Sequence, residues 1–168
     1  MSVLQMVFSL VLLLGFQTSN KLDSARTLFH GNMENESGLN SFIQAYEDSE
    51  NPKIVAYLGV ATTMKASHTI YPNSKLRYFN EGKKKIESSI LSEPNSPEIR
   101  YSRLLVQLKA PSFLLYNSNI SEDLNVFIKG IKNDPMSLYW KKRLISNLLA
   151  TEELSADQQT LLNNLNLN

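Results

Sequence analysis

The stretches IESSILSEP (residues 86–94) and FIKGIKNDP (residues 127–135) repeat one helical pattern. In each, a bulky apolar residue is followed by a small residue three positions later, then an aliphatic residue, then a proline four positions on. The offset between the two stretches is 127 − 86 = 41 residues. The apolar pair packs into a core, the small residue admits a second helix, and the proline leads into the next element. The repeat predicts two similar helix–turn units.

Helical spacing of apolar residues continues outward from these stretches along the whole chain. Turn signals stand between the periodic segments, above all Asn51-Pro52, Ser96-Pro97 and Asp134-Pro135. No convincing alternation of apolar and polar residues indicates a strand. We therefore predict an all-α fold of about seven or eight helices, arranged as antiparallel helical hairpins. The expected helices are residues 20–30, 39–48, 52–66, 74–91, 97–108, 121–132, 136–150 and a last one capped by Ser155.

Two stretches carry specific predictions about burial. The helix over residues 74–91 is expected to bury Leu76, Phe79, Ile86 and Ile90. The segment from Pro111 to Tyr116 (PSFLLY) is expected to fold back over the core, because burial of each large side chain is worth about 1.5–3 kcal/mol. A solvent-exposed patch in that segment would instead indicate a partner site.

The N-terminal segment has the character of an export signal. Val3 to Phe16 (VLQMVFSLVLLLGF) is uncharged and apolar, too short for a comfortable membrane span but suited to a signal peptide. We expect residues 1–19 to be a signal peptide and residues 20–168 a single helical domain of an exported, periplasmic or secreted protein. An uncleaved anchor and a helix buried in the fold are the alternatives, and the anchor would be the expected route of membrane contact.

Composition argues against several functional classes. The 17 basic and 16 acidic side chains give a net charge of +1, so the chain has no global attraction to nucleic acid. There is no cysteine, which excludes disulfides and thiolate chemistry. His30 and His68 stand in no metal-ligand pattern; we interpret His30 as a charge complement at a helix C-terminus and His68 as a loop residue.

Catalytic motifs are also missing from the sequence. The glycines are isolated rather than gathered in a phosphate-binding loop, and there is no nucleophile elbow. Adjacent carboxylates such as Glu152 and Glu153 point about 100° apart on a helix, so they do not converge as an acid–base pair. We therefore predict no enzyme, no catalytic residue, no metal and no cofactor. Arg100 and Arg103 are interpreted as structural partners of Glu98 or of a carboxylate on the preceding helix.

The repeat resembles the second helix of a tetratricopeptide repeat, which has a small residue, an aromatic residue four later, and a proline after the helix. Gly82, Ile86 and Pro94 match this pattern loosely, as do Phe127 and Pro135 of the second unit, where Asp123 occupies the small position. Leu58-Gly59 resembles the Leu-Gly of the first helix, but Val55 replaces the Trp and Thr62 the Tyr. Gly59 and Gly82 also stand farther apart than the family spacing. The resemblance implies a degenerate tetratricopeptide-like array over roughly residues 40–150.

Residues 57–123, with YFNEGKKKIE (78–87) and PSFLLYNSNI (111–120), also resemble an uncharacterised group of exported, mostly Bacteroidetes-type proteins. That resemblance implies export and no particular activity.

These patterns favour an exported interaction or scaffold module that binds a protein or peptide partner, because stacked hairpins form a groove. The residues expected to line that groove are Tyr57, Lys65, Tyr78, Lys85 and Arg100. A small-molecule-binding helical protein with an apolar cavity is the first alternative. A metal-independent enzyme that uses dispersed Glu or Asp, Tyr and Arg side chains is the second.

Overall fold

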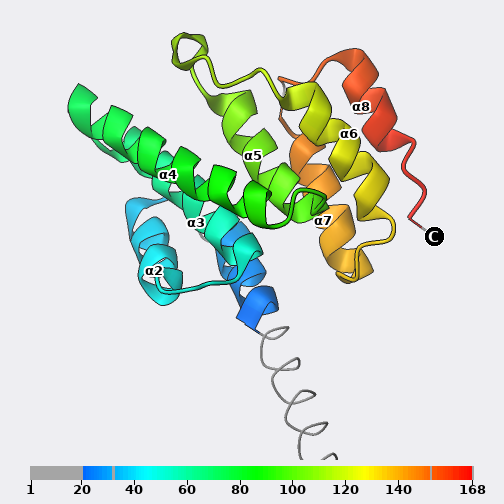
Figure 1. Ribbon diagram of the computed structural model, residues 1–168, viewed down its shortest axis with the longest axis horizontal. Coiled ribbons are helices and arrows are strands. Elements are labelled where there is room, and N and C mark those ends of the chain that lie inside the picture. The colour runs from blue at the N-terminus through cyan, green and yellow to red at the C-terminus, as the bar shows by residue number, and fades with distance from the viewer. Residues whose placement is uncertain (1–20, 32, 152, 168) are drawn as a thin grey trace, which may run out of the picture.

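The computed structural model describes residues 21–31, 33–151 and 153–167. The predicted export signal, residues 1–19, lies outside the described residues. Within them the chain is helical and contains no strand, which confirms the all-α prediction (Figure 1). Residues 21–31 form the first helix. The later elements are α2 (Glu36–Tyr46), α3 (Pro52–Met64), the 3₁₀ turn η1 (Lys65–His68), α4 (Pro72–Ser92), α5 (Pro97–Lys109), the 3₁₀ turn η2 (Ser112–Leu114), α6 (Ile120–Ile131), α7 (Leu138–Leu149) and α8 (Ala156–Asn163).

Local capping explains most of the helix starts. The side chain of Asn51 accepts hydrogen bonds from the first turn of α3, and Pro52 occupies its first position. Ser155 and Gln158 form a reciprocal capping box at α8, as the sequence predicts for Ser155. Ser96 is the residue before α5, but its side chain makes no capping hydrogen bond. The helix α2 begins earlier than predicted, because the side chain of Asn35 caps it by accepting from Gly38 N.

Two helix pairs dominate the packing. The helices α3 and α4 lie side by side, and so do α5 and α6 (Figure 1). The repeated stretches occupy the same place in both pairs, at the end of the second helix. Ile86 and Phe127, the bulky residues of the two stretches, are fully buried. The repeat thus marks two packed helix pairs, while the finer tetratricopeptide-like arrangement stays a prediction.

Gly59 of α3 and Gly82 of α4 meet where these two helices are closest. A Cβ atom built on Gly59 would lie 2.5 Å from Ile86 Cγ1 and 2.7 Å from the carbonyl oxygen of Gly82. A Cβ built on Gly82 would collide with the carbonyl oxygen of Gly59 and lie 2.8 Å from the backbone nitrogen of Thr63. The two backbones are therefore in contact, which no other residue type permits.

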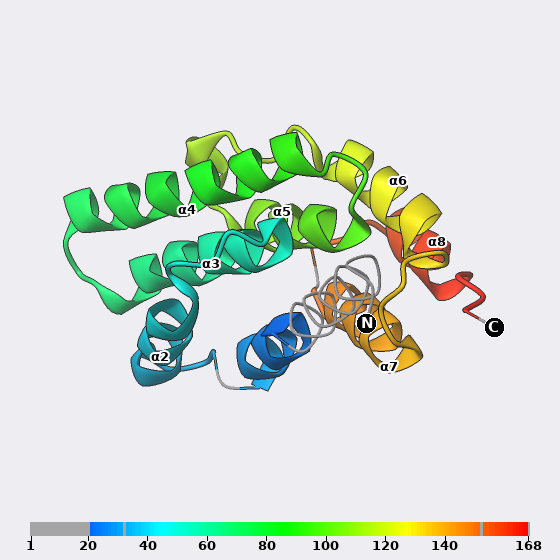
Figure 2. The same cartoon turned by 60° about the horizontal axis from the view of Figure 1, so that its bottom comes forward.

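The helix of residues 21–31 lies against three later helices (Figure 2). Phe29 stacks at 4.5 Å from the ring of Tyr57 in α3, and Arg26 reaches α5. The main-chain oxygen of His30 accepts a hydrogen bond from Arg143 of α7. We call the side of α3, α5 and α7 that meets this helix the inner face. The chain's own first helix covers this face.

Two burial predictions are wrong in part. Leu76 is 50% exposed, because it lies in the first turns of α4, beyond the end of the core. In the segment from Pro111 to Tyr116, Tyr116 is buried and Leu114 packs partly on the core. Phe113 and Leu115 are exposed instead, because the turn η2 directs neighbouring side chains to opposite sides.

Candidate functional site

Glu98 is a fully buried carboxylate at the centre of the inner face. It lies in the first turn of α5, where the helix dipole favours a negative charge. Both of its oxygens accept from Arg26, at 2.6 Å from Nε and 2.7 Å from Nη2, and Oε1 also accepts from the hydroxyl of Tyr57 at 2.7 Å. Such a bidentate, hydrogen-bonded pair neutralises both buried charges. The cluster therefore holds the first helix to α3 and α5.

Burial and the charge of the Glu98 carboxylate determine the protonation states of Arg26 and Tyr57. Burial, assisted by the nearby charge of Glu98, raises the pKa of Tyr57 well above its usual range, so its hydroxyl remains a donor. Burial alone would lower the pKa of Arg26, but its hydrogen bonds and the charge of Glu98 outweigh burial and raise it. Neither group is poised to exchange a proton near neutral pH, which favours a structural role.

His30 lies in an aromatic pocket between the first helix, α3, α5 and α7. The centres of the Trp140, Tyr57 and Tyr101 rings lie 5.6, 5.7 and 5.9 Å from the centre of its imidazole. Its Nδ1 is 3.1 Å from the side-chain amide nitrogen of Asn147, while its buried Nε2 has no hydrogen-bond partner among the described residues. Burial first, then the charges of Arg143 and Arg26, lower the pKa of His30 to about 4. His30 is therefore neutral at pH 7, and its interpretation as a charged helix-end complement is wrong.

The lowered pKa of His30 predicts a stability loss in mild acid. The pKa is about 4 in the folded chain against 6.5 for the free side chain, so the unfolded chain binds more protons between these values. The free energy of unfolding should fall as the pH drops from about 6.5 towards 4, by about 2–3 kcal/mol in all. Urea unfolding at pH 7.5 and 5.5 measures the first part of this loss. A His30→Gln variant should show a smaller loss, and an equal loss would contradict the assignment.

Asp123 is a second fully buried carboxylate, at the junction of α4, α5 and α6. It accepts from Arg100 at 2.8 Å, from Arg103 at 2.6 and 2.7 Å, and from Gln107 at 2.6 Å. Arg103 also donates to Glu87 of α4 at 3.0 Å. This contact confirms the predicted pairing with a carboxylate on the preceding helix, while Glu98 pairs with Arg26 instead. The cluster joins the two helix pairs.

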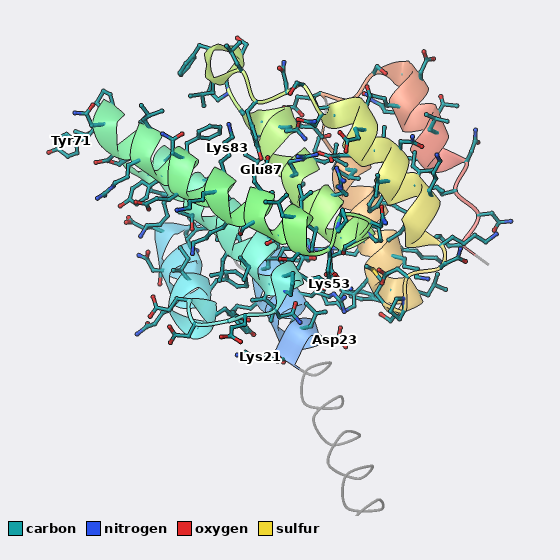
Figure 3. The ribbon with its side chains drawn as sticks, viewed as in Figure 1. Lys21, Asp23, Lys53, Tyr71, Lys83 and Glu87 are labelled. Atoms are coloured by element: carbon teal, nitrogen blue, oxygen red, sulfur yellow. The ribbon has the colours of Figure 1, made fainter. Side chains whose placement is uncertain are left out.

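The edge of α4 that faces the loop after α5 is also organised around an aromatic ring. Tyr116 donates its hydroxyl proton to Glu87 at 2.7 Å, and the ammonium of Lys83 lies 4.8 Å from the centre of its ring. Figure 3 shows Lys83 and Glu87 projecting from α4 towards that loop. These contacts anchor the loop at Tyr116 and place the ammonium of Lys83 beside the loop.

The five predicted groove residues do not share one surface. Tyr57 is fully buried and Arg100 is 6% exposed, and both are engaged in the buried clusters. Neither is available to a macromolecular partner, which corrects their assignment to a groove. Periodicity alone did not reveal this, because the buried carboxylates that accept hydrogen bonds from Tyr57 and Arg100 lie far along the chain, at Glu98 and Asp123.

Lys65 and Tyr78 come together at the edge of the α3–α4 pair, and Lys85 lies farther along the same side of α4. The ammonium of Lys65 lies 5.2 Å from the centre of the Tyr78 ring, and the guanidinium of Arg77 lies 5.1 Å from it. Lys85 follows Tyr78 by two turns, so both lie on one side of α4. Within the described residues, none of these three cations forms an ion pair. We call Lys65, Arg77, Tyr78 and Lys85 the basic edge.

A shallow depression of about 370 Å³ lies between the turn before α5 and the turn after α6. Lys53, Glu93 and Asp134 contribute charge to its wall. Ser96 also lines it, and the buried Ser96 hydroxyl has no hydrogen-bond partner in the described part of the chain. The depression is open and has charged residues in its wall, unlike the apolar cavity expected of a small-molecule carrier.

Comparisons with known proteins supply no further assignment: no protein-family model, curated protein or solved structure matches the chain. Among the described residues there is no cluster of side chains able to hold a metal ion. No helix in the described part of the chain is both long and apolar enough to cross a bilayer.

Proposed function

We propose that this protein is an exported helical interaction module that binds an acidic segment of a protein partner along the basic edge. The observation that carries the proposal is that Lys65 and Arg77 at the Tyr78 ring, and Lys85 two turns along α4, have no carboxylate partners in the described chain. By contrast, Arg26, Arg100 and Arg103 form ion pairs inside the fold. A cationic edge with an aromatic surface is complementary to carboxylates interspersed with apolar residues.

The geometry suits a segment laid along α4. Lys65, Tyr78 and Lys85 are all partly buried, and long side chains of this kind bury their apolar stems while their polar ends stay available to a partner. Glu81 is exposed between Tyr78 and Lys85 and offsets part of the positive charge. Each exposed charge pair contributes about 0.2–1 kcal/mol, so binding should be modest and weakened by salt.

Export rests on the N-terminal sequence, and the tetratricopeptide-like array on the repeat at residues 86–94 and 127–135. The small-molecule alternative has less support, because the depression beside Lys53 is open and charged. The enzyme alternative also has less support, because Glu98 and Asp123 are enclosed by arginines rather than directed to a cavity.

Charge reversal tests the proposal. The variant Lys65→Glu/Arg77→Glu/Lys85→Glu should bind a fluorescein-labelled polyglutamate–phenylalanine peptide about tenfold more weakly than the wild type, because three attractive pairs become repulsive. Fluorescence anisotropy at low and physiological salt measures the change. The matched control Lys129→Glu/Lys132→Glu/Lys142→Glu alters three exposed cations elsewhere and the net charge equally. Equal weakening in both variants would show that only the net charge matters and would refute the assignment to the basic edge.

A further inference from the structure

Five large apolar side chains are exposed at the free end of α4 and in the loop after α5. They are Ile70 (84% exposed), Tyr71 (67%), Leu76 (50%), Phe113 (78%) and Leu115 (82%). The loop lies beside the half of α4 that carries Leu76, because Tyr116 packs on Phe79 of that helix, and Tyr71 stands at the free end of α4 in Figure 3. We call these five residues the apolar tip. Apolar surface gathered in this way indicates an interaction site rather than ordinary surface scatter.

The loop presents its two apolar side chains on a fixed backbone. Leu115 has a φ of 50°, in the left-handed region that a leucine adopts only at a cost of about 1 kcal/mol. Its neighbours hold this conformation, because Leu114 packs partly on the core and Tyr116 is buried against Phe79 and Glu87. In this conformation Leu115 is 82% exposed and gains little burial. A partner outside the chain would supply that burial.

Cations border the apolar tip. Lys83 lies over the ring of Tyr116 on the edge of α4 that carries Leu76, while Lys75 and Lys84 are exposed on the same helix. None of these lysines forms an ion pair within the described residues. The carboxylate nearest to Lys83 on this edge, Glu87, is engaged by Arg103 and Tyr116. The tip therefore combines apolar side chains with uncompensated positive charge.

We propose that the apolar tip docks on the surface of an anionic lipid bilayer. Side chains that project separately from a helix end and a strained loop can each enter the boundary between headgroups and acyl chains, with no matching pocket required. The neighbouring lysines then meet anionic headgroups, each strengthening binding by about fivefold. Docking is peripheral, since no described helix is able to span the bilayer. Leu76 and Lys83 lie on the edge of α4 opposite Tyr78 and Lys85, and the proposed docking does not depend on the proposed protein partner.

A single fluorophore tests the proposal in the full chain. The protein contains no cysteine, so Asn117→Cys, in the loop, and Asn163→Cys, on α8, each give one labelling position at an exposed site. With an environment-sensitive dye at position 117, we expect a blue-shifted and brighter emission on vesicles of phosphatidylcholine with phosphatidylglycerol. The dye at position 163 should not respond. This local readout is independent of any lipid contact made by the apolar N-terminal sequence.

Two variants complete the test. Phe113→Ser/Leu115→Ser should lower the apparent partition constant reported by position 117 at least tenfold, because two apolar side chains leave the membrane boundary. Leu91→Ser/Tyr139→Ser removes comparable exposed apolar surface elsewhere and should leave it unchanged. Vesicle binding without an emission change at position 117 would overturn the proposal. An emission change at position 117 that appears without vesicles when the protein concentration is raised would also overturn the proposal, because it indicates self-association. So would an emission change that the acidic peptide produces without vesicles.

Discussion

Replacing Asp123 with asparagine should lower the free energy of unfolding by about 3–5 kcal/mol, the cost of breaking a buried ion pair from one side. The change removes the charge that receives hydrogen bonds from Arg100, Arg103 and Gln107 but keeps the shape of the side chain. Glu87 and Glu122 remain beside the arginines but are partly or fully exposed to solvent, so they compensate only in part. The melting temperature should fall by about 10 °C for a chain of this length.

Urea unfolding followed by circular dichroism measures the effect of Asp123→Asn. The control is Asp157→Asn, which removes an exposed carboxylate from the first turn of α8 and should cost less than about 0.5 kcal/mol. A loss below about 1 kcal/mol in Asp123→Asn would mean that the arginines find solvent or other acceptors. The two helix pairs would then not depend on this cluster.

Replacing Gly82 with alanine should destabilise the fold by about 1–3 kcal/mol or more, although alanine is the better helix former. The added methyl group meets backbone atoms of Gly59 and Thr63, which can move only if α3 and α4 separate. Gly59→Ala should act in the same direction, because its methyl group would collide with Ile86 and with the carbonyl oxygen of Gly82. Thermal unfolding of both variants measures the cost.

Gly31→Ala is the matched control for these glycine substitutions. A Cβ at this position would meet no atom within 4 Å, and the glycine has no positive φ. The same chemical change should therefore leave stability unchanged or raise it by up to about 1 kcal/mol. If Gly31→Ala and Gly82→Ala shifted the melting temperature alike, the backbone contact between α3 and α4 would not be the cause.

The helices could be predicted because their signals are local. Asn51-Pro52 and Ser96-Pro97 place the starts of α3 and α5, and helical spacing of apolar residues marks their length. The repeat at residues 86–94 and 127–135 identifies the equivalent ends of α4 and α6. Such features depend on a few neighbouring residues, so one sequence is sufficient to read them.

The buried clusters could not be predicted, because they join residues far apart in the chain. Arg26 and Glu98 are 72 positions apart, and nothing near either residue shows that both charges are buried. The sequence did indicate structural pairing for Arg100 and Arg103, since they lie among apolar neighbours, but not their shared partner Asp123. Tyr57 was misplaced for the same reason: a tyrosine on a periodic helix can face a groove or a core, and only its contact with Glu98 distinguishes them.

The exposed segments were mispredicted because burial depends on where the core ends. Leu76 has the right spacing for the buried side of α4, but its end of the helix extends beyond the helices that could cover it. Phe113 and Leu115 alternate with the anchored Leu114 and Tyr116, a pattern that becomes visible only once η2 and the left-handed Leu115 are known. These outliers from the sequence pattern include the side chains that we propose to contact the membrane surface.

Mapping the acidic peptide by NMR tests the proposed function most directly. The labelled protein is titrated with the polyglutamate–phenylalanine peptide while the backbone amide signals are followed. We expect the shifts to concentrate on η1 and on the side of α4 that carries Lys65, Arg77, Tyr78 and Lys85. Equal shifts around Lys129, Lys132 and Lys142, or shifts confined to the inner face around Glu98, would contradict the assignment of the basic edge as the partner site.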